Sequence, residues 1–301
     1  MTATGARASG ATTPVIIEAA LNGITSRGRN PNLPMAPDEL ARDAIACVDA
    51  GATVVHTHAH NFGAPVDELV GTYAECYEAV LAARPGTILY PTIGGGTTSA
   101  ERFHHVVELA SSGLIRASFL DPGSVNLGGV GSDGLPPPID YVYTNTFNDT
   151  RYGVDVCNRH RLGPSVAVFE PGFLQVVLAY HEAGALPPGT LVKLYFAGGG
   201  YITGGRALWG VPPIPEGLDL YLAMLGDSGI PWAVALIDGD ALAHPLTRRA
   251  LERGGHLRVG LEDDPRASGN EELVRAATEM CTSVGRPVAT LADTEQILGL
   301  P

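Results

Sequence analysis

Short apolar runs alternate with longer helix-forming stretches along almost the whole chain, and this alternation constrains the fold more than any other feature. Eight runs have the length and the apolar or β-branched composition of buried strands: 14–21, 52–58, 87–92, 115–119, 165–170, 191–197, 231–237 and 256–262. Helical stretches are expected between and after them at 36–51, 66–83, 99–113, 172–183, 216–228, 241–253 and 270–285. Eight strand-then-helix units without a break in composition predict an α/β fold, the (β/α)8 TIM barrel.

The main alternative fold is a doubly wound open sheet. The first strand is not followed by the GxGxxG turn of a dinucleotide-binding fold, so the barrel is favoured. We expect one catalytic barrel domain over residues 14–301 and a flexible tail over residues 1–13, which are small and polar. The irregular segment 121–163 is expected to hold an extended loop after the fourth strand, together with the fourth helix.

Charge and composition exclude several classes of protein. A formal net charge of -13 argues against a nucleic-acid surface, which needs clustered lysine and arginine. No stretch approaches the roughly 18 apolar residues of a membrane span, and the N-terminus lacks the apolar segment of a signal peptide. The four cysteines are far apart, which favours buried free thiols over a disulfide frame or a thiolate metal site. A cytoplasmic enzyme without a nucleic-acid or membrane partner is therefore expected.

Polar residues close several of the predicted strands. Because active sites of TIM barrels lie at the C-terminal ends of the strands, these residues are candidates for one site. They are His56 and His58 on the second strand, Thr92 on the third, Ser118 on the fourth, Glu170 on the fifth, and Arg258, Glu262 and Asp263 at the eighth.

The stretch "ATVVHTHAHNFG" (52–63) predicts a metal site. His56 and His58 share one face of a strand, and Glu262 follows the eighth strand, which only the first strand separates from the second. Two imidazoles and one carboxylate with open positions suit catalytic zinc, with manganese, iron or cobalt as alternatives. His60 is not expected to be a ligand, because the chain is leaving the barrel there. The competing interpretation is that the histidines are rim residues with ordinary hydrogen bonds.

The order of "LNG", "NPNLPMAPDEL", "GATVVHTHAH", "PTIGG", "GSVNLG", "FEPG" and "GGHLRVGLEDD" resembles the β-keto acid cleavage enzyme family, from about residue 14 to the C-terminal end. The resemblance implies a barrel enzyme with one zinc ion and acetyl-CoA as co-substrate. It implies that a β-keto acid condenses with acetyl-CoA and that a retro-Claisen step yields acetoacetyl-CoA and a new acyl-CoA. It also implies a homo-oligomer, either a dimer or a tetramer.

The same resemblance implies roles for individual residues. The metal ligands fall on His56, His58 and Glu262, in agreement with the spacing argument, and Asp263 becomes the base that removes the C2 proton, held by Arg258. The family's hydroxyl residues fall on Thr92 and Ser118, which would donate hydrogen bonds to oxygens that gain charge, and the strand-five glutamate is Glu170. Each role has a structural alternative: an Arg258–Asp263 salt bridge, hydroxyls that satisfy backbone groups, and a helix cap at Glu170.

Departures from the family pattern concern the substrate. His60 stands where members usually carry arginine, and Thr25 stands where one member carries a glutamate that meets a substrate amino group. Glu18 adds an acidic side chain inside the first strand. Substrate contacts are expected from Thr25, Glu18, Glu170 and His60, and the loss of an anion at Thr25 argues against an aminated substrate.

Two other classes of function stay open on the sequence. One is a metal-dependent hydrolase or aldolase on the same rim, without any need for CoA. The other is a non-catalytic ligand-binding barrel.

Overall fold

Eight parallel strands, ordered β3-β2-β1-β8-β7-β6-β5-β4, form the centre of the protein in the computed structural model, which describes residues 13–201 and 203–301. The strands are β1 (Ile17–Ala20), β2 (Val54–Thr57), β3 (Ile88–Pro91), β4 (Ala117–Leu120), β5 (Gly163–Val168), β6 (Leu191–Ala197), β7 (Trp232–Ile237) and β8 (His256–Val259). β3 and β4, at the two ends of this order, lie next to each other, so the sheet is a nearly closed barrel. The prediction of a (β/α)8 TIM barrel is confirmed.

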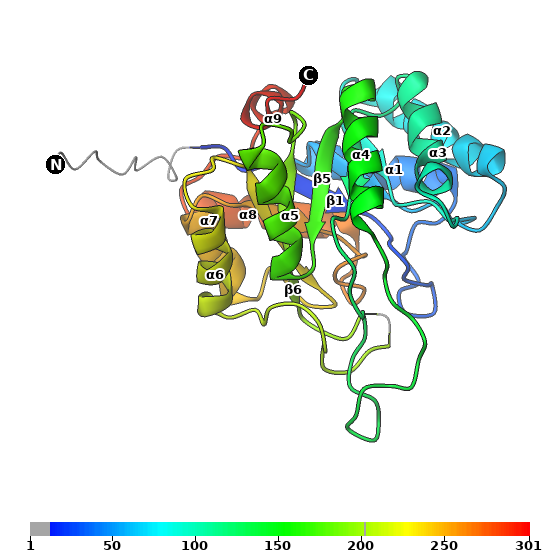
Figure 1. The fold of residues 1–301 in the computed structure, drawn as a ribbon. Helices are drawn as coiled ribbons and strands as arrows, with labels where there is room; N and C mark the ends of the chain where they lie inside the picture. The colour runs from blue at the N-terminus through cyan, green and yellow to red at the C-terminus, as the bar shows by residue number, and fades with distance from the viewer. Residues whose placement is uncertain (1–12, 202) are drawn as a thin grey trace.

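Helices alternate with the strands and cover the outside of the barrel (Figure 1). They are α1 (Pro37–Ala50), α2 (Val66–Ala83), α3 (Ser99–Ser111), α4 (Phe147–His160), α5 (Pro171–Glu182), α6 (Pro215–Leu225), α7 (Pro245–Glu252), α8 (Asn270–Ser283) and α9 (Leu291–Leu298). Local sequence explains many of their ends. Thr98, Thr146 and Thr290 each accept a hydrogen bond from the third backbone N–H of the helix that follows. α1 begins with a proline in its first turn and ends at Gly51, whose φ of 121° suits glycine.

Most element boundaries agree with the sequence analysis, and the differences fall at strand ends. The predicted helix over 66–83 and strand over 191–197 have the observed bounds. The fifth and eighth strands end earlier than expected, at Val168 and Val259, so Glu170 and Glu262 lie in the turns that follow them. The last helix, α9, was not predicted. Of the predicted tail, residues 1–12 lie outside the described residues.

The loops that follow the strands gather at one end of the barrel, at the bottom of Figure 1. The longest, 121–146, leads from β4 to α4, and its two arms are joined by an antiparallel bridge between Val125 and Tyr143. A second bridge joins Gly129 to Ala207 in the loop after β6. The predicted long loop after the fourth strand therefore contributes to the wall around the C-terminal end of the barrel.

No helix among residues 13–201 and 203–301 has the length and apolarity needed to cross a membrane.

Candidate active site

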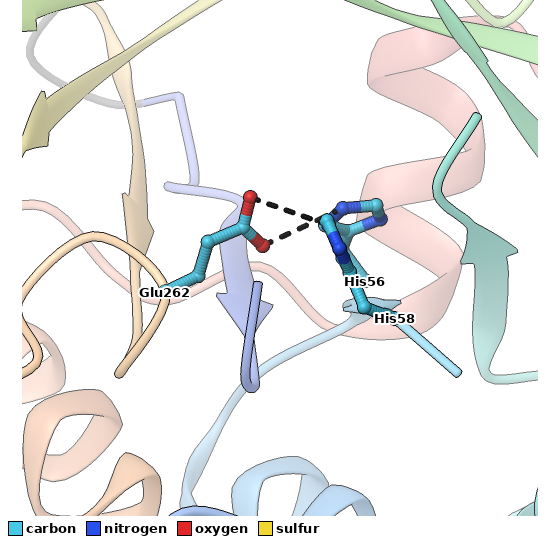
Figure 2. A group of neighbouring side chains, drawn as sticks. All are labelled: His56, His58 and Glu262. Atoms are coloured by element: carbon cyan, nitrogen blue, oxygen red, sulfur yellow. Dashed lines mark ion pairs between the residues drawn. The ribbon is translucent and has the colours of Figure 1, made fainter. Parts of the chain in front are cut away.

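His56 on β2, His58 directly after it and a glutamate from the turn after β8 meet at the C-terminal end of the barrel (Figure 2). These two strands flank β1, so residues at their ends are neighbours. Glu262 Oε2 lies 3.5 Å from His56 Nε2, and Glu262 Oε1 lies 3.5 Å from His58 Nε2. One ligand atom from each residue lies within 4.8 Å of the other two. The structure thus brings together the three residues that the sequence predicted as metal ligands.

Neighbouring groups hold the ring of His56 and the backbone of His58. The ring of His56 stacks on that of Tyr90, with centroids 4.4 Å apart, and its Nδ1 lies 3.3 Å from the Tyr90 carbonyl oxygen. With the proton on Nδ1, that carbonyl accepts it and Nε2 keeps a lone pair toward Glu262. The side chain of Asn22 donates to the His58 carbonyl at 2.8 Å and accepts from the His58 N–H at 2.9 Å. The backbone that carries the second imidazole is therefore held from β1.

The three side chains fit a divalent transition metal. His58 Nε2 and Glu262 Oε2 are buried and have no hydrogen-bond partner in the described part of the chain, which is costly unless another group satisfies them. Burial lowers the pKa of His56 well below its ordinary value, against the opposing effect of Glu262, so the imidazole is neutral. Burial alone would raise the pKa of Glu262, but Arg258 and the two histidines hold it well below its usual range. Two imidazoles and one carboxylate form a donor set that zinc and its neighbours accept.

Arg258, which is only 1% exposed, links three carboxylates beneath the two histidines. Its Nη1 lies 2.9 Å from Glu18 Oε1, and its Nη2 lies 2.9 Å from Glu262 Oε1. Its Nε donates to Asp263 Oδ2 at 3.0 Å. Because a buried ion pair that loses one partner leaves an uncompensated charge, these four side chains act as one unit.

Asp263 differs electrostatically from the glutamate beside it. Burial raises the pKa of Asp263 above its ordinary value, and Arg258 only partly opposes this effect. A carboxylate with a raised pKa is a stronger base than an ordinary aspartate, which suits it to proton removal near neutral pH.

A second buried ion pair lies next to this unit. Lys193, on β6, is 3% exposed, and its Nζ lies 3.4 Å from Glu18 Oε1. The same Nζ donates to the Tyr90 hydroxyl at 2.7 Å, and that hydroxyl donates to Glu18 Oε1 at 2.5 Å. Burial alone would raise the pKa of Glu18, but the charges of Lys193 and Arg258 and the hydrogen bond from Tyr90 hold it at about 2. The polar interior of the barrel thus runs from the histidines through Tyr90 to Lys193.

A cavity of about 410 Å³ opens above these groups. His56, His58 and Glu262 line one side of it, and much of the remaining wall is aromatic: Tyr90, Phe119, Tyr141, Tyr143, Phe169, Tyr195 and Tyr201. A concave, mostly apolar space with a few convergent polar groups is the usual form of a small-molecule site.

Three of the other residues predicted for the site line this cavity: Thr25, Thr92 and His60. The remaining ones do not. Glu18, Arg258 and Asp263 lie behind the lining, in the network just described. Glu170 is the N-cap residue of α5, and its carboxylate accepts a hydrogen bond from the Gly210 N–H at 2.9 Å.

Ser118 lies on the opposite face of its strand from the cavity. Side chains alternate along β4, and it is Phe119 that faces the cavity. The Ser118 hydroxyl is fully buried, donates to the Phe119 carbonyl at 3.1 Å and contacts the Cys157 thiol on α4. The structural alternative for Ser118, a hydroxyl that satisfies a backbone group, describes its contacts, and the predicted role as a donor to substrate has no support from its position.

The polar cavity residues that were not identified from the sequence include Asn22, Tyr90, Asp121 and Lys193. The signals were weak. Tyr90 and Lys193 lie inside apolar strands at positions that a periodicity argument assigns to core, although a lysine in "LVKLYFA" is unusual for a fully buried strand. Asp121 follows β4 directly, which is the position from which barrel strands present functional groups.

Comparisons with known proteins identify the family. The model of the beta-keto acid cleavage enzyme family matches residues 14–300. The chain is 28% identical over 302 residues to a 3-keto-5-aminohexanoate cleavage enzyme of Acetoanaerobium sticklandii, covering 95% of this chain and 98% of the relative. It is 27% identical over 299 residues to a 3-oxoadipate:acetyl-CoA acetyltransferase of Cupriavidus necator, covering 96% of each.

Among solved structures, the apo structure of ObcA superimposes with a TM-score of 0.63 at 16% identity. The match covers 90% of this chain and 66% of that chain, so this protein spans about two thirds of its length. At this identity the likeness shows the fold alone.

Proposed function

Because this chain belongs to the β-keto acid cleavage enzyme family, we propose that it is an enzyme that uses a divalent metal, with zinc preferred, and acetyl-CoA to cleave a β-keto acid. The observation that carries the proposal is the convergence of His56, His58 and Glu262 on one wall of the cavity, where the buried His58 Nε2 and Glu262 Oε2 have no hydrogen-bond partner in the described part of the chain. The names of the relatives, which include an acetyl-CoA acetyltransferase, support the use of acetyl-CoA.

Atom balance fixes the products. Removal of a C2 proton gives an enolate, which attacks the acetyl thioester and releases CoA thiolate. The thiolate then attacks the original keto carbon, the bond between C2 and C3 breaks, and the departing enolate takes back a proton at C2. Only one CoA enters, so only one product can be a thioester. The products are the new acyl-CoA and free acetoacetate, which corrects the expectation of acetoacetyl-CoA as the second product.

The chain's own residues supply acid–base chemistry and positioning. A bound divalent metal would act as a Lewis acid and lower the energy of negative charge on the keto oxygen. We assign removal of the C2 proton to Asp263, whose carboxylate Arg258 orients through Nε and Nη2. Asp263 lies behind Glu262 rather than on the cavity wall, so the proton transfer requires the substrate to seat directly over the metal ligands.

Thr92 and the aromatic side chains of the cavity wall contribute hydrogen bonding and the exclusion of water. Thr92 lies at the cavity edge just past β3, where its hydroxyl can donate to the substrate carboxylate or to an oxygen that gains charge. The aromatic side chains exclude water, which keeps the thioester and the enolate from competing hydrolysis and protonation.

The test is a direct assay of the balanced reaction. Zinc-loaded protein is incubated with acetyl-CoA and a panel of β-keto acids, and acetoacetate and acyl-CoA products are followed by mass spectrometry. Equal amounts of acetoacetate and one new acyl-CoA, lost on removal of the metal, are expected. Cleavage that proceeds equally without acetyl-CoA would replace the proposal with the hydrolase or aldolase interpretation. Binding of the acids without turnover would support a non-catalytic barrel.

The oligomeric state and location stay predictions. We propose a cytoplasmic dimer or tetramer, as the family resemblance implies. Size-exclusion chromatography with light scattering measures the oligomer directly, and a monomer at micromolar concentration would contradict it.

A further inference from the structure

Lys193 and Asp121 face the same cavity from neighbouring positions in the barrel wall. In the pairing of β4 with β5, Leu120 is opposite Val166, which places Asp121 beside Ala167. In the pairing of β5 with β6, Ala167 is opposite Lys193. The three residues therefore form a row across three strands, and all three line the cavity. The middle member is an alanine, whose short side chain fills less of the space between the ammonium group and the carboxylate than a longer side chain would.

Lys193 has donor capacity that its protein partners do not use fully. An ammonium group has three N–H donors, and in the described residues its recorded partners are the Tyr90 hydroxyl at 2.7 Å and the more distant Glu18 carboxylate at 3.4 Å. Burial lowers the pKa of Lys193, while the adjacent Glu18 opposes this effect. One donor is thus available to an acceptor in the cavity.

Asp121 has acceptor capacity in the same space. Its Oδ2 accepts a hydrogen bond from the Tyr143 hydroxyl, and for Oδ1 no partner is recorded among residues 13–201 and 203–301. Burial raises the pKa of Asp121, and the Tyr143 hydrogen bond and the charge of Lys193 lower it. The charge of Asp121 affects the pKa of Lys193, so the two side chains interact electrostatically. Among the described residues, however, the ion pair of Lys193 is with Glu18. A ligand group that met both side chains would therefore not have to break an ion pair between them.

This pair of opposite charges discriminates between substituents. An ammonium group on the substrate would be attracted by Asp121 but repelled by Lys193. A carboxylate would be attracted by Lys193 but repelled by Asp121. A plain alkyl chain would leave one donor and one acceptor unpaired in a desolvated site, which is costly. A hydroxyl group accepts from Lys193 and donates to Asp121 at the same time.

The distance from the metal ligands places this gap along the substrate's acyl chain. Tyr90 stacks on His56 at one end and contacts Lys193 with its hydroxyl at the other, so about one aromatic ring separates the metal ligands from the ammonium group. An acid whose carboxylate and keto oxygens lie at the metal ligands can extend its carbon chain toward that row, because both line the same cavity.

On the basis of the proposed function, we infer that the β-keto acid accepted by this site carries a hydroxyl group on its chain beyond the keto carbon, bound between Lys193 and Asp121. This assignment gives the substrate class that Thr25 alone leaves open. It also gives Lys193 and Asp121 the role of specificity-determining residues.

The test compares acids of one chain length. The panel is 3-oxohexanoate, 5-hydroxy-3-oxohexanoate, 6-hydroxy-3-oxohexanoate, 5-amino-3-oxohexanoate and 3-oxoadipate, each with acetyl-CoA and zinc-loaded protein. We expect kcat/KM for a hydroxylated acid to exceed that for each other acid by about 100-fold or more, because a site built to bind a hydroxyl rejects analogues that lack it. A preference for the alkyl, amino or dicarboxylic acid would overturn the inference.

Variants test whether the pair causes the preference. Lys193→Met is expected to reduce the ratio of kcat/KM between the hydroxylated and alkyl acids by at least 10-fold. The double variant Glu18→Gln/Lys193→Met removes the charge of Glu18 together with that of its partner Lys193, and replaces the single variant if that one is poorly folded. Asp121→Asn, which keeps the shape, is expected to reduce the ratio less. A change of equal factor for every acid would mean that Lys193 has only a structural role.

Failure of the inference and failure of the proposed function give different results. Turnover of the panel without a hydroxyl preference contradicts only the inference. Absence of acetyl-CoA-dependent turnover with every acid contradicts the proposed function. In that case calorimetric binding of the same five acids to zinc-loaded wild type and Lys193→Met still measures the hydroxyl preference.

Discussion

The position of Glu262 depends on the absence of a side chain at residue 23. Gly23 has a positive φ of 56°, and a Cβ atom added there would lie 2.3 Å from Glu262 Cγ. The short sequence "LNG" after β1 therefore serves the site twice, because Asn22 holds the backbone of His58 and Gly23 leaves space for the carboxylate.

Gly23→Ala is expected to weaken metal binding by about 10- to 100-fold, because the new methyl group displaces Glu262 from the two histidines. Competition with a chromogenic chelator measures the affinity. The matched control is Gly184→Ala, which has a similar φ of 64° but no atom within 4 Å of an added Cβ. Equal metal affinity in the Gly23 variant and wild type would show that Glu262 is not placed by this contact.

Asp263→Asn is expected to lower kcat by about 10²- to 10⁴-fold, the range for loss of a general base, with metal content unchanged. Asp264→Asn is the control, since Asp264 is the next carboxylate in the chain but pairs with Arg266. The rates come from the acetoacetate assay and the metal content from atomic emission. An Asp263 variant with wild-type kcat would leave the Arg258–Asp263 pair as a structural salt bridge.

At the scale of the element, the sequence predicts where a strand lies better than which residue ends it. The strand predicted over 115–119 is observed at Ala117–Leu120, and of its alternating side chains it is Phe119 rather than Ser118 that faces the cavity. Boundaries are set by backbone pairing with neighbouring strands, which local composition does not encode. The prediction for His56 and His58 did not depend on the strand boundary, because residues i and i+2 of an extended chain point to the same face.

Arg286, between α8 and α9, closes the opposite end of the barrel. It is 2% exposed, and its guanidinium donates to the carbonyl oxygens of Thr13, Leu251 and Gly255. Arg286→Ala is expected to lower the free energy of unfolding by about 2–4 kcal/mol, because charge-assisted hydrogen bonds to buried carbonyls are lost. Arg286→Lys should lose less. Urea denaturation measures both, and loss of metal binding in the folded Arg286→Ala protein would contradict the separation of the two ends.

The contact between α1 and α8 predicts a pH-dependent stability. Burial raises the pKa of Asp43 to about 6 from an ordinary 3.8, with Glu271 and Glu272 adding to the effect and a hydrogen bond from Asn270 opposing it. The folded state therefore binds this proton more tightly, so the contribution of Asp43 to stability is fully present below pH 3.8 and is lost as the pH rises through about 6.

Asp43→Asn removes that loss and keeps an oxygen for Asn270. The variant is expected to be more stable than wild type by about 1 kcal/mol at pH 7.5, with a smaller difference at pH 5. Thermal unfolding at the two pH values measures the difference. A gain that is larger at pH 5 would contradict the assigned direction of the pKa.

At the scale of the whole molecule, the alternation of strands and helices predicts the barrel, and the barrel places strand ends together. The barrel prediction was sufficient to bring His56 and His58 together with Glu262, which follows His56 by 206 positions in the chain. It was not sufficient for the ion pair of Glu18 with Lys193, 175 positions apart, because both lie within strands where a pattern argument expects apolar core. Their proximity depends on how the barrel interior is filled, and only the assembled structure shows it.

The central claim is that His56, His58 and Glu262 hold the metal on which acetyl-CoA-dependent cleavage depends. The most direct measurement is the metal content of purified wild type and His58→Ala, with His60→Ala as the matched control from the same histidine-rich stretch. We predict close to one zinc ion per chain in wild type and in the His60 variant, and little in the His58 variant, together with loss of acetoacetate formation. Metal retained at full occupancy in His58→Ala, or absent from all three proteins after reconstitution with zinc, would contradict the account.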